Sequence, residues 1–140
     1  MAKQPDTLFP IAKSNDEWRE LLGVERYHVL REHGTEPSGT SLLLQEHRDG
    51  VYRCAGCGAL LFDSATKYDS GSGWPSFTHP RRNALGTSVD KSHFMARTEV
   101  HCRNCGGHLG HVFPDGPKPR GLRYCLNGAS LAFVPTSEDS

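Results

Sequence analysis

The sequence lacks an excess of charge of either sign, and it lacks any long apolar segment. Its 140 residues contain 16 Lys and Arg against 16 Asp and Glu, which gives a formal net charge of zero. No apolar run approaches the ~20 residues that span a bilayer, and residues 1–6 lack the apolar stretch of a signal peptide. These absences argue against nucleic-acid and membrane partners. We therefore expect a soluble, cytoplasmic protein.

The chain has an odd number of cysteines, five. A disulfide framework that pairs every thiol is therefore excluded, and a cytoplasmic protein keeps its thiols reduced. Four of the cysteines form two C-x-x-C pairs, Cys54 with Cys57 and Cys102 with Cys105, and Cys125 is left over.

The content of glycine and proline predicts a β-rich domain, because 15 Gly and 9 Pro allow many turns between short strands. Short apolar segments bounded by Gly, Pro, Asp or Asn predict strands at 51–53, 59–62, 94–101, 109–113, 122–126 and 130–134. Apolar and polar residues alternate along 94–101, which predicts the one buried face and one exposed face of antiparallel sheets. The segment 42–44 is either a brief strand or a link.

Two short helices are predicted before this β-rich region. Ser14 and Glu17 form a capping box, and Gly23 ends the first helix. The second helix follows directly and ends at a cap near Gly34. No linker divides the chain, so we expect a single domain at 14–135, between an N-terminal arm at 1–13 and a tail at 136–140.

The two C-x-x-C pairs predict a metal site, because such a turn places two thiolates at adjacent corners of a tetrahedron. Four soft thiolates form a closed site, which favours one structural Zn²⁺, with iron as a redox-sensitive substitute. The ligands would be Cys54, Cys57, Cys102 and Cys105, and the ion would join two distant parts of the domain. The alternatives are two redox-active dithiols or four unrelated buried thiols.

Cys125 has the surroundings of a nucleophile. It lies on a predicted strand, where Arg123 and Asn127 share its face at a spacing of two residues. A nearby Arg favours the thiolate, and an Asn amide orients either the thiol or the group that it attacks. The alternative is a small, buried apolar residue without a chemical role.

A group of acid–base residues precedes Cys125 along the chain. His108 and His111 are three residues apart, and Asp115 follows in a Pro-Asp-Gly turn. These side chains supply acids and an orienting carboxylate. Alternatively, the two histidines are surface residues or additional zinc ligands.

Together these motifs resemble one family, the B-type methionine sulfoxide reductases, which act on the R epimer of methionine sulfoxide. The resemblance extends from about residue 14 to residue 134 and implies the repair of oxidised proteins or peptides. The stretches that carry it are Glu17-Trp18, Arg31 to Glu36, the two C-x-x-C pairs, Lys67 to Gly71, Gly73 to Phe77, His108 to Pro117 and Arg123 to Asn127.

The resemblance implies a mainly β fold of two packed antiparallel sheets with short N-terminal helices, and a zinc site away from the active site. It implies that Cys125 is the nucleophile and that Trp74 and Phe113 bind the substrate. Without the resemblance, Trp74 would be interpreted as a packing residue. The other residues implied to surround the sulfoxide and the thiol are His108, His111, Asp115, Arg123 and Asn127.

Reduction of a sulfoxide needs a thiolate at sulfur and a proton at oxygen. Cys125 would supply the thiolate and become a sulfenic acid, while His111, with His108 or a water, would supply the proton. Many members of the family have a second cysteine two residues before the Trp, which forms a disulfide, but this chain has Ser72 there. We therefore expect thioredoxin, glutaredoxin or a small thiol as the external reductant. A zinc-stabilised binding module and a thiol hydrolase are alternative functions.

Overall fold

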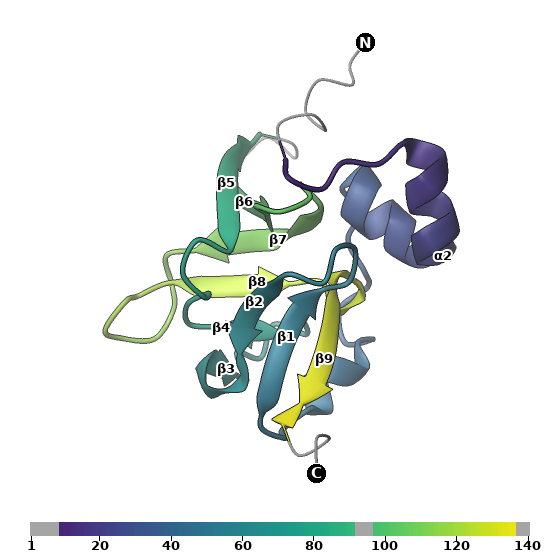
Figure 1. Ribbon diagram of the computed structural model, residues 1–140. Helices are drawn as coiled ribbons and strands as arrows, with labels where there is room; N and C mark the ends of the chain where they lie inside the picture. The colour runs from purple at the N-terminus through teal and green to yellow at the C-terminus, as the bar shows by residue number, and fades with distance from the viewer. Residues whose placement is uncertain (1–8, 92–96, 137–140) are drawn as a thin grey trace.

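The described residues form two antiparallel β-sheets, one kinked α-helix and short 3₁₀ turns (Figure 1). The computed structural model describes residues 9–91 and 97–136. The smaller sheet has the strand order β2 (Leu60–Asp63), β1 (Gly50–Cys54) and β9 (Leu131–Pro135). The larger sheet has the order β3 (Lys67–Tyr68), β4 (Ser76–Phe77), β8 (Arg123–Leu126), β7 (His108–Phe113), β6 (Arg97–Cys102) and β5 (Leu85–Asp90). The predicted mainly β fold with two antiparallel sheets is confirmed.

The helix α2 (Asn15–Glu32) begins at the predicted capping box. Ser14 Oγ accepts from the backbone N–H of Glu17 at 3.2 Å, and the Glu17 carboxylate accepts from the Ser14 N–H at 2.9 Å. Gly23 adopts φ 82°, a left-handed conformation that divides α2 into the two short segments predicted from the sequence. The buried side of α2 packs against β7 and against the 3₁₀ turn η4 (Gly128–Ser130).

An aromatic cluster fills the space between the two sheets. Tyr52 from β1, Phe62 from β2 and Phe77 from β4 are fully buried. The ring centroids of Phe62 and Phe77 are 4.2 Å apart, and those of Tyr52 and Phe77 are 5.1 Å apart. Such aromatic pairs contribute stability beyond their buried area. The cluster holds β4 in place, and β4 is hydrogen-bonded to β8, the strand that carries Cys125.

The predicted strands agree with the structure in position but not in number. Five of them match β1, β2, β7, β8 and β9 with ends displaced by at most one residue. β6 matches the described part of the predicted strand at 94–101, whose residues 94–96 lie outside the described ranges. The segment 42–44 forms the 3₁₀ helix η1 (Leu42–Gln45), and η2 (Ser64–Thr66) leads into β3. The sequence analysis missed β3, β4 and β5.

The described part of the N-terminal arm, residues 9–13, lies against the turn between β6 and β7. The N–H of Ile11 donates to the carbonyl of Asn104 at 2.9 Å, and Phe9 makes an edge-to-face contact with His101. The domain limits of 14–135 stay a prediction. Over residues 9–91 and 97–136, no helix has the length and apolar character that crossing a membrane requires.

Candidate active site and metal centre

A cavity of about 250 Å³ lies where β7 and β8 meet the segments that precede β4 and follow α2. A concave site with aromatic walls and a few polar groups is typical of ligand binding. Its lining comes from distant parts of the chain: Thr35, Ser72, Trp74, Arg97, Gly110, His111, Phe113, Arg123, Cys125, Leu126 and Asn127.

Cys125 occupies the third position of the short strand β8. The strand pairs Cys125 with His111 of β7 on one side and with Ser76 of β4 on the other. Its thiol is partly buried, and Sγ lies 3.8 Å from Ser72 Oγ. Burial raises the pKa of the Cys125 thiol, and the contacts with Ser72 and Arg123 offset part of that rise. Burial therefore favours the neutral thiol over the thiolate in the free protein.

Arg123 is fixed between a carboxylate and an aromatic ring. Its Nε and one terminal nitrogen donate to the two Asp115 oxygens at 2.9 and 3.2 Å, and its Cζ lies 4.5 Å from the centroid of the Phe113 ring. The guanidinium holds the pKa of Asp115 below its usual value. The Asp115 side chain is 65% exposed. It is connected to the cavity through its hydrogen bonds with Arg123, which lines the cavity.

His111 is held by a carboxylate from a neighbouring strand. His111 Nε2 lies 2.9 Å from Asp90 Oδ2, and the same oxygen accepts from Arg97 at 3.0 Å. Asp90 ends β5 and Arg97 begins β6, which are paired in register at this point. Because a carboxylate can only accept, the contact requires a proton on Nε2 of His111.

His108 lies deeper than His111. Its side chain is 3% exposed, and Nδ1 lies 2.9 Å from Glu99 Oε2, which also contacts His33 Nδ1 at 2.8 Å. Burial lowers the pKa of His108, although Glu99 acts in the opposite direction. The ring contacts His111 edge to face, with centroids 5.5 Å apart. His108 therefore reaches the cavity through His111.

A buried carboxylate, Glu36, organises the segment that follows α2. Its oxygens accept from the N–H groups of Gly128 and Ala129 at 2.8 and 2.9 Å. Its backbone carbonyl accepts from Trp74 Nε1 at 2.9 Å, and its N–H donates to Asn127 Oδ1 at 2.9 Å. Glu36 thus fixes two of the residues that line the cavity.

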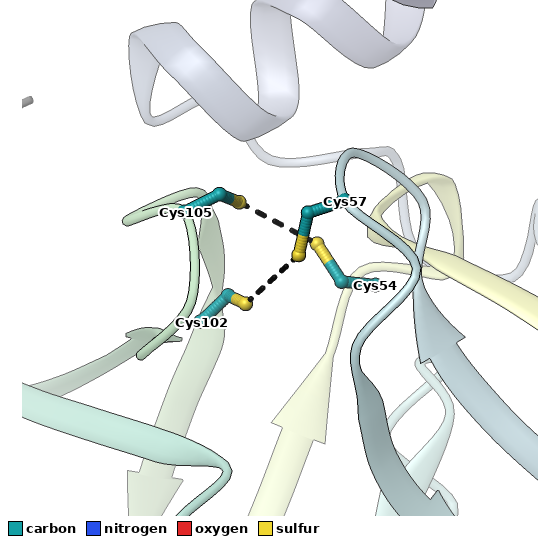
Figure 2. Close-up of side chains that lie close together, drawn as sticks. All are labelled: Cys54, Cys57, Cys102 and Cys105. Carbon is teal, nitrogen blue, oxygen red and sulfur yellow. Dashed lines mark hydrogen bonds between the residues drawn. The ribbon is translucent and has the colours of Figure 1, made fainter. Parts of the chain in front are cut away.

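The four cysteines of the C-x-x-C pairs come together at one point between the two sheets (Figure 2). Cys54 ends β1 and Cys102 ends β6, and each is followed by the turn that carries its partner. The sulfurs of Cys54 and Cys105 are 3.7 Å apart, and those of Cys57 and Cys102 are 3.6 Å apart. The four sulfurs lie close enough together to hold a metal ion, as the spacing predicts. The cavity lining contains none of these four residues.

N–H groups donate to three of the four sulfurs. The backbone of Gly56 donates to Cys54 Sγ at 3.3 Å, and the backbone of Asn104 donates to Cys102 Sγ at 3.4 Å. The side-chain amide of Asn104 donates to Cys57 Sγ at 3.2 Å. Such donors stabilise thiolates, the form of cysteine that binds metals.

Comparison with known proteins decides the family. A family model of the SelR domain matches residues 22–135. A peptide methionine sulfoxide reductase MsrB of Agrobacterium fabrum is 54% identical over 126 residues, which cover 89% of this chain and 93% of that protein. Proteins of the same name from Leifsonia xyli subsp. xyli and Bradyrhizobium diazoefficiens are 55% and 51% identical over 132 and 135 residues, with at least 93% of either chain covered. This chain belongs to the peptide methionine sulfoxide reductase MsrB family.

Membership of the MsrB family confirms the resemblance drawn from the motifs. The structure brings together six of the eight residues expected at the active site, and these line the cavity: Trp74, His111, Phe113, Arg123, Cys125 and Asn127. The other two, His108 and Asp115, are each in contact with one of these six. The individual roles of the eight residues stay predictions.

Sequence analysis missed the carboxylates that hold the site. Asp90 ends an exposed strand without an alternating pattern, so nothing in the local sequence marks it as a partner of His111. Glu99 belongs to a recognised strand, yet its pairing with His108 depends on the register between β6 and β7. Glu36 belongs to the stretch Arg31 to Glu36, which contributed to the family resemblance, but the sequence did not indicate which contacts Glu36 makes.

Proposed function

We propose that this chain reduces the R epimer of methionine sulfoxide in proteins or peptides with Cys125 as its nucleophile, which repairs oxidised proteins. One observation carries the proposal. A partly buried thiol, an imidazole held by a carboxylate and two aromatic side chains all border one cavity. The thiol is that of Cys125, the imidazole that of His111, and the aromatic side chains are those of Trp74 and Phe113.

The reaction balances as a transfer of one oxygen atom. The Cys125 thiolate attacks the sulfoxide, the bond between the methionine sulfur and its oxygen breaks, and the oxygen ends on Sγ as a sulfenic acid. Cysteine sulfur loses two electrons and methionine sulfur gains them. A proton is delivered to the oxygen, and methionine leaves as a neutral thioether.

His111 is the proposed proton donor. Asp90 occupies its Nε2–H, so the proton that reaches the sulfoxide oxygen comes from Nδ1 of the imidazolium. The Asp90 carboxylate fixes the orientation of the His111 ring through this contact. His108 supports His111 through the ring contact, and its own Nδ1–H is held by Glu99.

The aromatic walls of the cavity suit the other end of the substrate. Trp74 and Phe113 offer apolar surface for the methyl and methylene groups of the methionine side chain. The indole N–H of Trp74 is committed to the Glu36 carbonyl, so the ring is fixed and presents its carbon surface. Arg123 and Asn127 are proposed to act near the thiol, where both line the cavity.

Cys125 must then be reduced by a thiol from outside the chain. Ser72 stands beside the thiol and offers a hydroxyl, which cannot form a disulfide. The other four thiols belong to the metal site. An external thiol attacks the sulfenic acid and releases water, and a second thiol then resolves the mixed disulfide. Thioredoxin, glutaredoxin or a small thiol can each supply these two steps.

Zinc is the proposed metal. A tetrahedron with Zn–S bonds of about 2.3 Å has edges of about 3.8 Å, which agrees with the 3.6 and 3.7 Å between the paired sulfurs. Cys54, Cys57, Cys102 and Cys105 would hold the ion in a closed, structural site.

The protein is proposed to be located in the cytoplasm. Its five cysteines form no disulfides, which suits a reducing compartment.

Turnover of the two epimers tests the proposed function. A peptide that contains methionine R-sulfoxide is expected to be reduced when dithiothreitol is present, and the S-sulfoxide peptide is expected to remain. Chromatography of the two peptides after incubation measures both rates. Hydrolysis of esters or amides without sulfoxide reduction would indicate a thiol hydrolase, and peptide binding without turnover would indicate a binding module.

A single turnover without reductant tests how Cys125 is reset. The chain is expected to gain the mass of one oxygen atom, located at Cys125 and trapped there by dimedone, because no nearby free thiol is available to form a disulfide. The metal content should stay unchanged. A disulfide between Cys125 and a metal-site cysteine, with loss of metal, would refute the external-thiol proposal and make the metal site a redox partner. Intact and peptide mass spectrometry with metal analysis distinguish these products.

A further inference from the structure

Three serine hydroxyls form a chain that ends at the Cys125 thiol. Ser76 Oγ lies 2.7 Å from Ser70 Oγ, and Ser70 Oγ lies 2.8 Å from Ser72 Oγ. Ser72 Oγ in turn lies 3.8 Å from Cys125 Sγ. All three serines belong to the segment between β3 and the start of β4, and Ser76 is the strand partner of Cys125.

The contact at the far end of this chain favours one direction for its hydrogen bonds. Ser76 Oγ lies 3.1 Å from the Trp74 carbonyl, which can only accept and is the acceptor of the Ser76 hydroxyl. With the Ser76 hydrogen at that carbonyl, Ser70 donates to Ser76. The hydrogen of Ser70 is then used, so Ser72 donates to Ser70.

This order leaves Ser72 without a hydrogen for Cys125, so the thiol is the donor in the resting state. Ser72 Oγ then accepts from the Cys125 S–H and from the Trp74 N–H at 3.4 Å. Both of its acceptor positions and its one donor are used. The arrangement suits a protonated Cys125, in agreement with the burial that raises the pKa of this thiol.

Ionisation of Cys125 requires one change in the chain. The thiolate has no hydrogen to donate, so the Ser72 hydroxyl must rotate away from Ser70 and donate to Sγ. After this rotation, Ser70 Oγ still accepts a hydrogen bond from the backbone N–H of Ser72, which lies 3.3 Å away. Rotation of the Ser72 hydroxyl therefore changes the hydrogen-bond network from one that accepts from the thiol to one that donates to the thiolate.

We propose that Ser72 is a positioning residue of the reaction, whose hydroxyl accepts from the Cys125 thiol at rest and rotates to donate to the thiolate that attacks the sulfoxide. The inference depends on the proposed role of Cys125 as nucleophile. It also assigns Ser70 a part, because Ser70 competes with the thiolate for the Ser72 hydrogen.

Other charged and titratable groups face Cys125 and must be kept constant in any test. Arg123 lies on the same strand, Asp115 follows β7, and Tyr68 ends β3. His111 is the strand partner on β7, with Asp90 of β5 and Arg97 of β6 behind it. Substitution of Ser72 or Ser70 changes none of these charges.

The test measures the pKa of Cys125 in the full chain by its rate of alkylation with iodoacetamide, followed by mass spectrometry of the Cys125 peptide across a range of pH. Ser72→Ala is expected to raise this pKa by about one unit, which lowers the thiolate fraction at neutral pH about tenfold. Ser70→Ala is expected to lower the pKa, because the Ser72 hydrogen is no longer committed. Ser72→Thr keeps the hydroxyl and should restore the original profile.

Ser38→Ala is the matched control, because the Ser38 hydroxyl donates to the backbone carbonyl of Ser72 at 3.1 Å. It perturbs the same segment without touching the thiol, and its profile should coincide with that of the unchanged protein. An unshifted profile for Ser72→Ala, shifts in the same direction for Ser72→Ala and Ser70→Ala, or a Ser38→Ala shift as large as that of Ser72→Ala would each overturn the proposal. The assay contains no sulfoxide, so its result is independent of whether the proposed activity is found.

Discussion

Cys125→Ser is expected to lower the rate of sulfoxide reduction by roughly 10⁴-fold or more. Serine has nearly the size of cysteine, but its hydroxyl does not ionise at neutral pH and is a far weaker nucleophile. The proposed oxygen transfer requires an electron pair from sulfur at this position, and the cavity lining contains no second cysteine. The measurement is the steady-state rate with an R-sulfoxide peptide and dithiothreitol.

The control for Cys125→Ser is the integrity of the protein. Cys125 is only partly buried and does not belong to the metal site, so thermal unfolding and metal content should be unchanged. Residual activity within tenfold of the original protein would exclude Cys125 as the nucleophile. Loss of activity together with loss of structure would also contradict the expected result, because it would give Cys125 a structural role.

Removal of the metal is expected to unfold much of the protein. Structural zinc sites contribute about 10–16 kcal/mol, which equals or exceeds the total stability of about 5–15 kcal/mol of an ordinary domain. The site joins the end of β1 in the smaller sheet to the end of β6 in the larger one. It is also connected to α2, because Arg31 donates to the Cys105 carbonyl at 2.9 Å and lies over the ring of Trp18.

Circular dichroism and the fluorescence of the two tryptophans during chelation measure this unfolding, and added zinc should reverse it. Cys102→Ser is the matching variant, and Cys125→Ser is its control because both remove one thiol. Cys102→Ser should lose metal and structure, whereas Cys125→Ser should lose neither. A folded, active chain with well under one equivalent of metal would disprove the structural role of the ion.

Local sequence was sufficient to predict the elements whose signals are local. The capping box at Ser14 and the break at Gly23 appear where predicted, because each depends on a few neighbouring residues. Strand β5 was missed because it is largely exposed and lacks alternation. β3 and β4 have two residues each, too few for a periodic pattern. β4 exists as a strand because it pairs with β8, and β3 exists as a strand because it pairs with β4.

The same distinction applies to the site. The C-x-x-C spacing predicted the cluster of four cysteines that could hold a metal ion, since each pair is a local turn and only the meeting of the two pairs is non-local. The partners of the histidines were not predictable, because Asp90 reaches His111 only through the register of three strands. The family resemblance identified Ser72 as the position where many members have a second cysteine. The chain of hydroxyls around Ser72 could not be predicted, because it depends on the fold.

The bonds that Glu36 makes to Gly128 and Ala129 have a consequence for the order of folding. They close a loop of about ninety residues, as the sequence separations of 92 and 93 show. Contacts of such high sequence separation form late, because the entropy of closing the loop must be overcome first. During synthesis, the two C-x-x-C turns emerge before the segment that captures Glu36. We therefore expect the strands that carry the four cysteines to be able to pair before Glu36 completes the cavity beside Cys125.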